Sequence, residues 1–580
     1  MNRLLVPLAA GLLAATGLRA QEIPGRAPIM FTGVPLLDDA RRAQRAFEEF
    51  RHEHLPNFPG GGRGGPNNCD EQVGRFCYWY DESAPPPPPE PASIRAERLR
   101  MLALFDTVTT QYPQDDWTAG QRVRYWQEEG NPKAEVLAAL ACRGERWWCS
   151  ALAGFAYHDA RDFVRADSAY TASLAQMSPK QRCDWSDLGI LLDDYTNRTY
   201  RRFECGTPER ADYEKRLWWL AKPLYSQPGL DTRSEFLARM TMTRMLEDAP
   251  SAYQFGFDAD ERELLLRYGW DRAWALGPRD QATGVRGVIG YELEPAYQFL
   301  PPALLATNPA ISDSVDWENG RPPIHARYAP MYARRMKALP HQSALFRRGD
   351  SSLVVVAWDA TSVPLGKGNV RRQMSVTLAR GDSLQPVTAK RDDAPLTGVM
   401  TAMGPWGQLI MSAEMTAAGV DTALRARYGM RPPYAIGARV TLSDMLYFGE
   451  YNGLPSNLDE TLPHVLSTIR VRADQKLGVY FETYGTNPAG EKLKVTLTIA
   501  REEDEPGFVR RRLQAMKLSR EAMPVSTTIE DLSARGASMT PRAAYLDIRT
   551  LKKGNYIVQL EVDVAGQYTV RSERALEITG

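Results

Sequence analysis

The residues with the clearest potential for chemistry are three close pairs of aspartates. Two carboxylates that face one cleft can act as acid and base, or as acid and nucleophile, on a glycosidic bond. The pairs are Asp193 with Asp194, Asp258 with Asp260, and Asp392 with Asp393. Asp258 and Asp260 follow a glycine, and short carboxylates in such segments accept neighbouring backbone N–H groups and shape turns. We therefore expect this pair to form a turn rather than a catalytic centre.

The histidines offer two further arrangements that could do chemistry. His52 and His54 flank a glutamate, but residues two apart on a helix face different ways and would not converge on a metal ion. His158 and Asp159 could be a base and its orienting acid, although adjacent side chains seldom bond in that geometry. The polar tip of a helical hairpin is the preferred interpretation. No G-x-S-x-G elbow, phosphate-binding loop or H-E-x-x-H helix occurs. The sequence thus predicts no catalytic residue, metal ligand or cofactor.

The six cysteines are more informative. An even number of cysteines behind an export signal is typical of disulfides. Their spacing favours pairing between neighbours, each closing a short loop that stabilises the fold by roughly 2–3 kcal/mol. The expected pairs are Cys69 with Cys77, Cys142 with Cys149, and Cys183 with Cys205. A zinc site is the alternative, which the absence of a C-x-x-C pair disfavours.

The N-terminus reads as a secretory signal over residues 1–20, with Arg3 before an apolar run and Ala20 at a cleavage position. An uncleaved membrane anchor is the alternative, but the run is short for a spanning helix. No later apolar run is long enough, so no transmembrane helix is expected after cleavage. Lys plus Arg and Asp plus Glu both total 71, and this balance argues against nucleic acid as a partner.

The residues before position 251 divide into a segment rich in glycine and proline and a segment with a helical pattern. Residues 21–95 are rich in glycine and proline and are expected to be poorly ordered, apart from a charged helix over 38–54. Residues 96–250 show helical periodicity, which predicts a disulfide-stapled array of helical hairpins. Within it, Ala151 to Pro179 resembles one tetratricopeptide repeat, with Ala166 and Tyr170 packing its second helix. Such arrays usually bind other proteins, although an array that packs only against its own chain is the alternative.

The stretch from Gly256 to Asp271 separates the helical half from the strand-patterned half. Its apolar run and a second run over 285–293 predict a strand pair. The stretch resembles the GWxTD proteins, a family of uncharacterised bacterial exported proteins. The resemblance rests on Gly256, Asp260, Tyr268, Gly269 and Asp271, while Phe257 stands at the family's Trp and Ala259 at its Thr. It implies no known activity. We expect residues 251–340 to be a structural junction in which Asp258 also shapes the turn.

Beyond residue 340 the apolar residues alternate with period two, as in strands with one face on a core. A first β-sandwich is expected over 341–445, with strands at 353–358, 373–379, 408–415 and 438–442. A second is expected over 446–580, where Leu493, Val495, Leu497 and Ile499 alternate with polar residues. The predicted fold class is therefore α+β multidomain, with a helical array, a mixed junction and two β-sandwiches.

These features favour an exported, non-catalytic scaffold or protein-binding protein of the cell envelope, periplasmic or extracellular. Its partner would be a protein held by the helical array. The alternative is a secreted carbohydrate-active or peptide-hydrolysing enzyme that uses paired carboxylates. Whether the protein is an enzyme is left open by the sequence, with the non-catalytic reading preferred, and neither the partner nor the oligomeric state is predicted.

Overall fold

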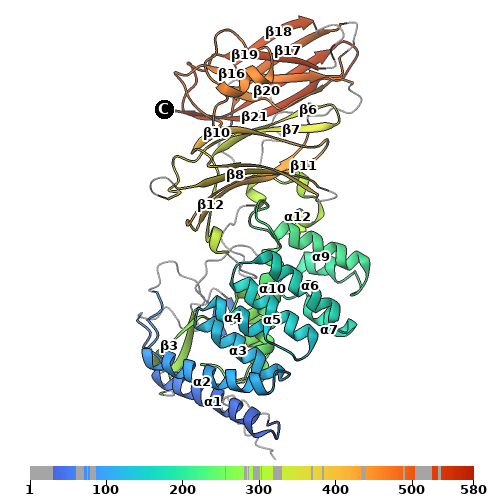
Figure 1. Ribbon diagram of the computed structural model, residues 1–580. Coiled ribbons are helices and arrows are strands. Elements are labelled where there is room, and N and C mark those ends of the chain that lie inside the picture. The colour runs from blue at the N-terminus through green and yellow to red at the C-terminus, as the bar shows by residue number, and fades with distance from the viewer. Residues whose placement is uncertain are drawn as a thin grey trace, which may run out of the picture. The chain divides into compact units, whose positions relative to one another are not determined.

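The computed structural model describes residues 31–59, 71–74, 76–78, 86–254, 256–279, 284, 286–291, 301, 303–317, 330–366, 370–381, 385–432, 439–486, 490–502, 525–532, 537 and 539–580. Helices dominate the first half and β-sheets follow them (Figure 1), which confirms the α+β multidomain class. The chain divides into two compact units, residues 1–156, 239–265 and 270–292, and residues 157–238, 266–269 and 293–580. In the described residues, no helix is both long enough and apolar enough to cross a membrane.

The first unit is mainly helical. Its elements are α1 (Pro35–His54), β1 (Glu71–Val73), β2 (Phe76–Tyr78), α2 (Ala92–Gln111), α3 (Asp116–Glu128), α4 (Pro132–Leu140), the start of α5 (Arg146–Asp159), the end of α10 (Asp231–Glu247), most of α11 (Ala259–Tyr268), and the strand pair β3 (Ala273–Arg279) and β4 (Arg286–Tyr291). Its core combines Phe47 of α1, Phe105 of α2 and Tyr125 of α3. Burial of these aromatic rings is the main favourable term that holds the helices together.

The charged helix expected over residues 38–54 is present as α1 and packs into the core of this unit, while α2 begins at Ala92, inside the segment expected to be poorly ordered. Glu48 and Arg51 of α1 are fully buried, and Arg51 is paired with Glu48 at 2.8 Å and with Glu128 of α3 at 2.9 Å. Arg124 lies 3.3 Å from Glu48 and completes the cluster. Burial raises the pKa of Glu48, against the two arginines that lower it. The sequence of α1 does not indicate that these charges are buried, because their partners lie in another helix.

The expected strand over the apolar run of Gly256–Asp271 is also wrong, because residues 259–268 form α11. Glu261 accepts the N–H of Asp258 at 3.1 Å, as in a capping box, and the Asp258 carboxylate accepts the N–H of Asp260 at 3.2 Å. Glu261, Leu265 and Tyr268 are buried at helical spacing. The second predicted strand does exist as β4, but its partner is β3.

The second unit begins with helices. They are the end of α5, α6 (Phe163–Gln176), α7 (Pro179–Ser186), α8 (Asp194–Tyr200), α9 (Pro208–Ala221) and the start of α10, followed by α12 (Ala303–Thr307) and the 3₁₀ turns η1 (Pro309–Ile311), η2 (Ser314–Trp317) and η3 (Met331–Ala333). Ala166 and Tyr170 of α6 are fully buried, as expected. Pro179 begins α7 rather than ending α6, because proline is suited to the first turn of a helix.

A buried carboxylate joins these helices to the β part of the same unit. Glu414 accepts the backbone N–H groups of Tyr225 at 2.8 Å and Ser226 at 2.9 Å, and Arg427 lies 3.0 Å away. Burial alone would raise the pKa of Glu414, but Arg427 and the N–H donors hold it below its usual value. Because both partners are buried, loss of either would leave an uncompensated charge.

The β part contains four sheets. The strands are β5 (Arg335–Ala338), β6 (His341–Arg348), β7 (Ser351–Asp359), β8 (Arg372–Arg380), β9 (Pro386–Asp392), β10 (Thr397–Pro405), β11 (Leu409–Ala417), β12 (Thr422–Met430), β13 (Thr441–Leu442), β14 (Leu446–Phe448), β15 (Arg470–Arg472), β16 (Leu477–Tyr484), β17 (Lys492–Arg501), β18 (Val525–Leu532), β19 (Met539–Leu546), β20 (Gly554–Val564) and β21 (Val570–Thr579), with α13 (Leu458–Thr461) and η4 (Leu462–His464) between β14 and β15. In space the strand orders are β5-β12-β11-β8-β9, β10-β7-β6, β13-β16-β14 with β19 beside β16, and β15-β21-β20-β17-β18.

These sheets pack in four layers with three hydrophobic interfaces. Met374 and Met411 meet Val354 and Val356 between the first two sheets. Phe346 and Val355 meet Phe448 and Tyr480 between the second and third. A third core fills the space between the last two sheets and contains the predicted residues Leu493, Val495, Leu497 and Ile499. Strand β7 is therefore buried on both faces, and the two sandwiches share one continuous stack.

One expected strand belongs to the other sandwich. The sequence placed residues 438–442 at the end of the first sandwich, but Thr441 and Leu442 form β13 and pair with Tyr484 and Thr483 of β16 in the second. Pattern alone cannot assign a strand of this length, because pairing partners are set by tertiary packing.

Candidate functional site

The stretch expected to act as a junction is built around two carboxylates. Asp260 lies against the backbone of Gly74 in the β1–β2 turn, where a Cβ atom would be 2.1 Å from the carboxyl carbon. Asp271 is half-buried and accepts the hydroxyl of Tyr253 at 2.6 Å. Burial raises the pKa of Asp271 to about 6, although the Tyr253 bond lowers it. Its role as a joint between two halves of the protein stays a prediction.

The other residues of this stretch have structural positions. Gly269 has a φ of +100°, a conformation that side chains disfavour. Tyr268 is buried, while Gly256 and Phe257 are half-buried ahead of α11. Asp258 accepts the N–H of Asp260 at 3.2 Å, so it shapes the turn as expected.

The remaining aspartate pairs lie at a helix start and at a turn. Asp193 precedes α8 and accepts the N–H groups of Tyr195 and Thr196, each at 2.9 Å. Asp393 lies in a turn with a φ of +51° and faces Arg371 at 3.3 Å. Carboxylates in such positions stabilise helix ends and turns.

His158 lies in a buried polar cluster that the sequence did not predict. Its Nδ1 lies 2.9 Å from the hydroxyl of Ser234, and its Nε2 lies 2.7 Å from a carboxylate oxygen of Glu235. All three residues are buried. The expectation of a polar hairpin tip is therefore wrong, because the first turns of α10, 76 residues further along the chain, supply the partners of the imidazole.

The hydrogen bonds show what this serine, histidine and glutamate can do. The Ser234 hydroxyl donates its single hydrogen to the carbonyl of Asp231 at 3.0 Å. Both contacts of the hydroxyl are satisfied only if His158 Nδ1 is the donor toward it. A serine nucleophile needs the opposite arrangement, in which the hydroxyl donates to the histidine. The cluster ties the end of α5 to the start of α10.

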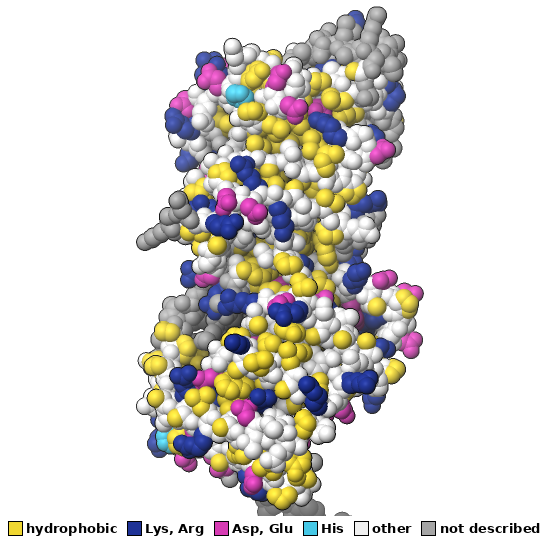
Figure 2. Space-filling model, in the orientation of Figure 1, with side chains coloured by type: hydrophobic (Ala, Val, Ile, Leu, Met, Phe, Trp, Pro, Cys, Tyr) yellow, Lys and Arg dark blue, Asp and Glu magenta, His cyan; other side chains and the backbone are white. Residues whose placement is uncertain are grey.

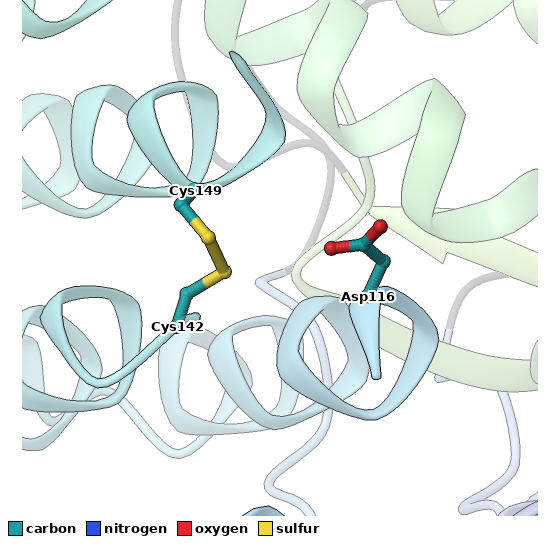
Figure 3. A group of neighbouring side chains, drawn as sticks. All are labelled: Asp116, Cys142 and Cys149. Carbon is teal, nitrogen blue, oxygen red and sulfur yellow. A yellow bond between two sulfur atoms is a disulfide. The ribbon is translucent and has the colours of Figure 1, made fainter. Parts of the chain in front are cut away.

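A second group brings a carboxylate to a disulfide. Cys142 bonds to Cys149, and Cys183 bonds to Cys205, as expected. The third expected pair, Cys69 with Cys77, involves a residue and a side chain outside the described part of the chain. The carboxylate of Asp116 points toward the first disulfide (Figure 3), and its oxygen and the two sulfurs lie within 4.8 Å of one another. Sulfurs joined in a disulfide are not thiolates, so this oxidised group is not a metal site.

The surface of the described residues includes a pocket and an apolar helix face. A pocket of about 870 Å³ in the second sandwich is lined by Tyr451, His464, Lys476 and Tyr545, among others. On α4, Leu137 is 60% exposed and Leu140 is 48% exposed. Hydrophobic side chains reach the surface over the helical part as well as over the sheets (Figure 2). An exposed leucine pair one turn apart on a helix is the more distinctive of these features.

Comparison with known proteins gives only distant similarities. No protein-family model and no curated protein matches the chain. Among solved structures, red sea bream transglutaminase is 13% identical over 56% of this chain and 43% of that protein, with a TM-score of 0.15. A DUF3823 family protein from Bacteroides ovatus is 8% identical over 36% and 89%, with a TM-score of 0.15. Bacteroides uniformis β-glucuronidase is 9% identical over 40% and 26%, with the same TM-score. The chain thus spans less than half of the transglutaminase, and these scores support no functional argument.

Proposed function

We propose that the protein is an exported, non-catalytic binding protein that holds a protein partner on its helical part. The observation that carries this proposal is the exposed pair Leu137 and Leu140 on α4. Residues three apart on a helix lie on one face, and burial of two leucine side chains by a partner would be favourable by about 1.5–3 kcal/mol each. Two disulfides fit an exported protein.

The helix that carries the leucines is held rigidly, as a binding surface requires. Asn131 caps its start by accepting the N–H of Ala134 at 3.1 Å. Just past its end, Arg143 donates its backbone N–H to the carbonyl of Pro113 at 2.9 Å, and the disulfide of Cys142 fixes the chain to α5. A pre-organised surface loses less conformational entropy on binding. The partner we expect presents an apolar helix or extended segment.

The alternative function, a secreted enzyme with paired carboxylates, needs two carboxyl groups facing one cleft. Asp193 and Asp258 instead accept backbone N–H groups at helix starts, and Asp393 lies in an exposed turn. These positions favour the binding protein over the enzyme.

The test is capture of a partner from the native cell envelope, followed by measurement of its affinity. Replacing both Leu137 and Leu140 by Ser should weaken binding by at least about tenfold, equivalent to about 1.4 kcal/mol. Leu99 on α2 is 40% exposed and makes a matched control, since Leu99→Ser changes an exposed leucine on another helix. Equal binding by the double variant, at an unchanged melting temperature, would contradict the proposal.

A further inference from the structure

The loop closed by Cys142 and Cys149 is folded around the carboxylate of Asp116. The backbone N–H of Glu145 donates to Asp116 Oδ1 at 3.0 Å, and the Trp148 indole donates to the Asp116 carbonyl at 3.0 Å. Gly144 permits this approach, because a Cβ atom there would lie 1.8 Å from the same Oδ1. The carboxylate is thus held against the disulfide by the backbone of the loop itself (Figure 3).

The two sulfurs have different surroundings. Cys142 is 7% exposed, whereas Cys149 is half-buried and lies in the first turn of α5. An external thiolate can therefore reach the sulfur of Cys149 more easily. The partial positive charge of a helix N-terminus stabilises a thiolate in this turn. Cys142 lacks that stabilisation and, as a buried thiolate, requires a proton from a neighbouring group.

We propose that Cys142–Cys149 is a redox-active disulfide that exchanges with a dithiol, and that Asp116 transfers the proton to and from Cys142. In the first step a thiolate of the dithiol attacks Cys149 Sγ, and the bond to Cys142 breaks. The Cys142 thiolate leaves with the electron pair and takes a proton from the Asp116 carboxyl. In the second step the other thiolate of the dithiol attacks the dithiol sulfur that is bonded to Cys149 in the mixed disulfide. The Cys149 thiolate leaves, the dithiol is oxidised to a disulfide, and the protein holds two reduced cysteines.

The surroundings of Asp116 suit this role. Its carboxylate is partly withdrawn from water, and burial raises its pKa, while the bond from Glu145 lowers it. A carboxyl with a raised pKa holds a proton closer to neutral pH, where exchange takes place. In the reverse direction the carboxylate accepts the proton of the Cys142 thiol, and the resulting thiolate attacks a mixed disulfide on Cys149.

The second disulfide provides a control in the same molecule. Over the described residues, one group of three His, Cys, Asp or Glu side chains has its polar or sulfur atoms within 4.8 Å of one another, and it consists of Asp116, Cys142 and Cys149. Cys183 and Cys205 therefore have no described carboxylate that lies as near to both sulfurs. We expect that disulfide to be structural and slow to react.

The experiment treats the folded, oxidised full-length protein with limiting dithiothreitol and a chelator, from about pH 5 to about pH 8. Acid quenching, alkylation and peptide mass spectrometry then give the reduction rate of each disulfide. Cys142–Cys149 should be reduced at least about tenfold faster than Cys183–Cys205 in the same sample. Equal rates for the two disulfides, or reduction of Cys142–Cys149 only above the melting temperature, would overturn the proposal without any variant.

Asp116→Asn separates proton transfer from structure, because its amide oxygen can still accept the N–H of Glu145. The reduction of Cys142–Cys149 should slow by about tenfold. Its rate relative to that of Cys183–Cys205, a ratio that cancels the pH-dependent thiolate fraction of dithiothreitol, should lose its dependence on pH. Asp162→Asn is the matched control, since Asp162 caps α6 by accepting the N–H of Arg165 at 3.0 Å and lies away from either disulfide in sequence. It should change neither rate. An unchanged rate and pH profile in Asp116→Asn would remove Asp116 from the reaction.

Discussion

At the scale of single residues, Asp271 has the most consequential environment. The residue is half-buried, and its carboxylate accepts the Tyr253 hydroxyl at 2.6 Å. Gly290 allows this contact, because a Cβ atom there would lie 2.2 Å from both the Asp271 carboxyl and the Tyr253 oxygen. Burial raises the pKa of Asp271 from 3.8 to about 6. The folded protein therefore binds this proton more tightly than the unfolded chain, and the contribution of Asp271 to stability is lost as the pH rises from about 4 to about 6.

Asp271→Asn should remove this pH dependence, since an amide does not ionise and its oxygen still accepts the Tyr253 hydroxyl. Between pH 4 and pH 7 the variant should become more stable relative to the wild type, by up to about 3 kcal/mol in the free energy of unfolding. Chemical denaturation at each pH measures it. The hydrogen bond from Tyr253 lowers the pKa of Asp271 in the wild type. Tyr253→Phe removes this bond and raises that pKa further, so the loss of stability should extend to higher pH. Parallel profiles for wild type and Asp271→Asn would contradict the assignment.

At the scale of elements, α11 shows that a short apolar run can form a helix where a strand was expected, when a helix cap precedes it. A strand over residues 264–268 would place Leu264 and Leu266 on one face and Leu265 on the other. In the helix, Leu265 and Leu266 are buried and Leu264 is half-buried. The capping box of Asp258 and Glu261 satisfies backbone groups at the helix start. The two structures differ in which leucine contributes most to stability.

Leu265→Ala should lower the free energy of unfolding by about 2–5 kcal/mol through lost transfer energy and the cavity left behind. Leu264→Ala removes the same atoms from a half-buried position and should cost less than half as much. Denaturant unfolding of the two variants beside the wild type gives both values. Equal losses at the two positions would show that Leu264 is as deeply packed as Leu265, contrary to the helix described here.

At the scale of the whole molecule, the β part of the second unit acts as one stack. Strands β6 and β7 supply the core of the first sandwich with Leu345, Val354 and Val356, and with the opposite faces they meet the second sandwich. Arg348 of β6 also pairs with the buried Glu482 of β16. A shared layer of this kind couples the stabilities of the sandwiches, because unfolding either one exposes an apolar face of the other.

Phe346→Ala should therefore destabilise both sandwiches. Phe346 is fully buried between the second and third sheets, and its truncation should cost about 3–5 kcal/mol. Native-state hydrogen exchange should show protection lost in β14 and β16 as well as in β6 and β7. Val387→Ala on the edge strand β9 is the control, since Val387 is 47% exposed and should change stability by less than about 0.5 kcal/mol. Loss of protection confined to the first sandwich would show that the stack is not coupled.

Local patterns in the sequence predicted much of this architecture. The alternation of Leu493, Val495, Leu497 and Ile499 placed a strand and its buried face, because side chains on a strand alternate with a period of two whatever the strand packs against. The spacing of the cysteines predicted three disulfides between neighbours, and the two that lie within the described residues are present, since a short loop brings its own ends together. The break between helices and strands followed from the change of period.

Tertiary structure alone decided the interactions that join distant parts of the chain. Glu48 and Arg51 have the composition of a solvated helix and become a buried cluster only because Arg124 and Glu128 lie opposite. Asp116 carries no signal in the sequence that it will lie beside Cys142 and Cys149, since the contact depends on how α3 and the α4–α5 loop pack. The type of a residue and the local spacing of apolar residues indicate the backbone conformation at that position. The partner that neutralises a charge or shares a proton is set by the fold.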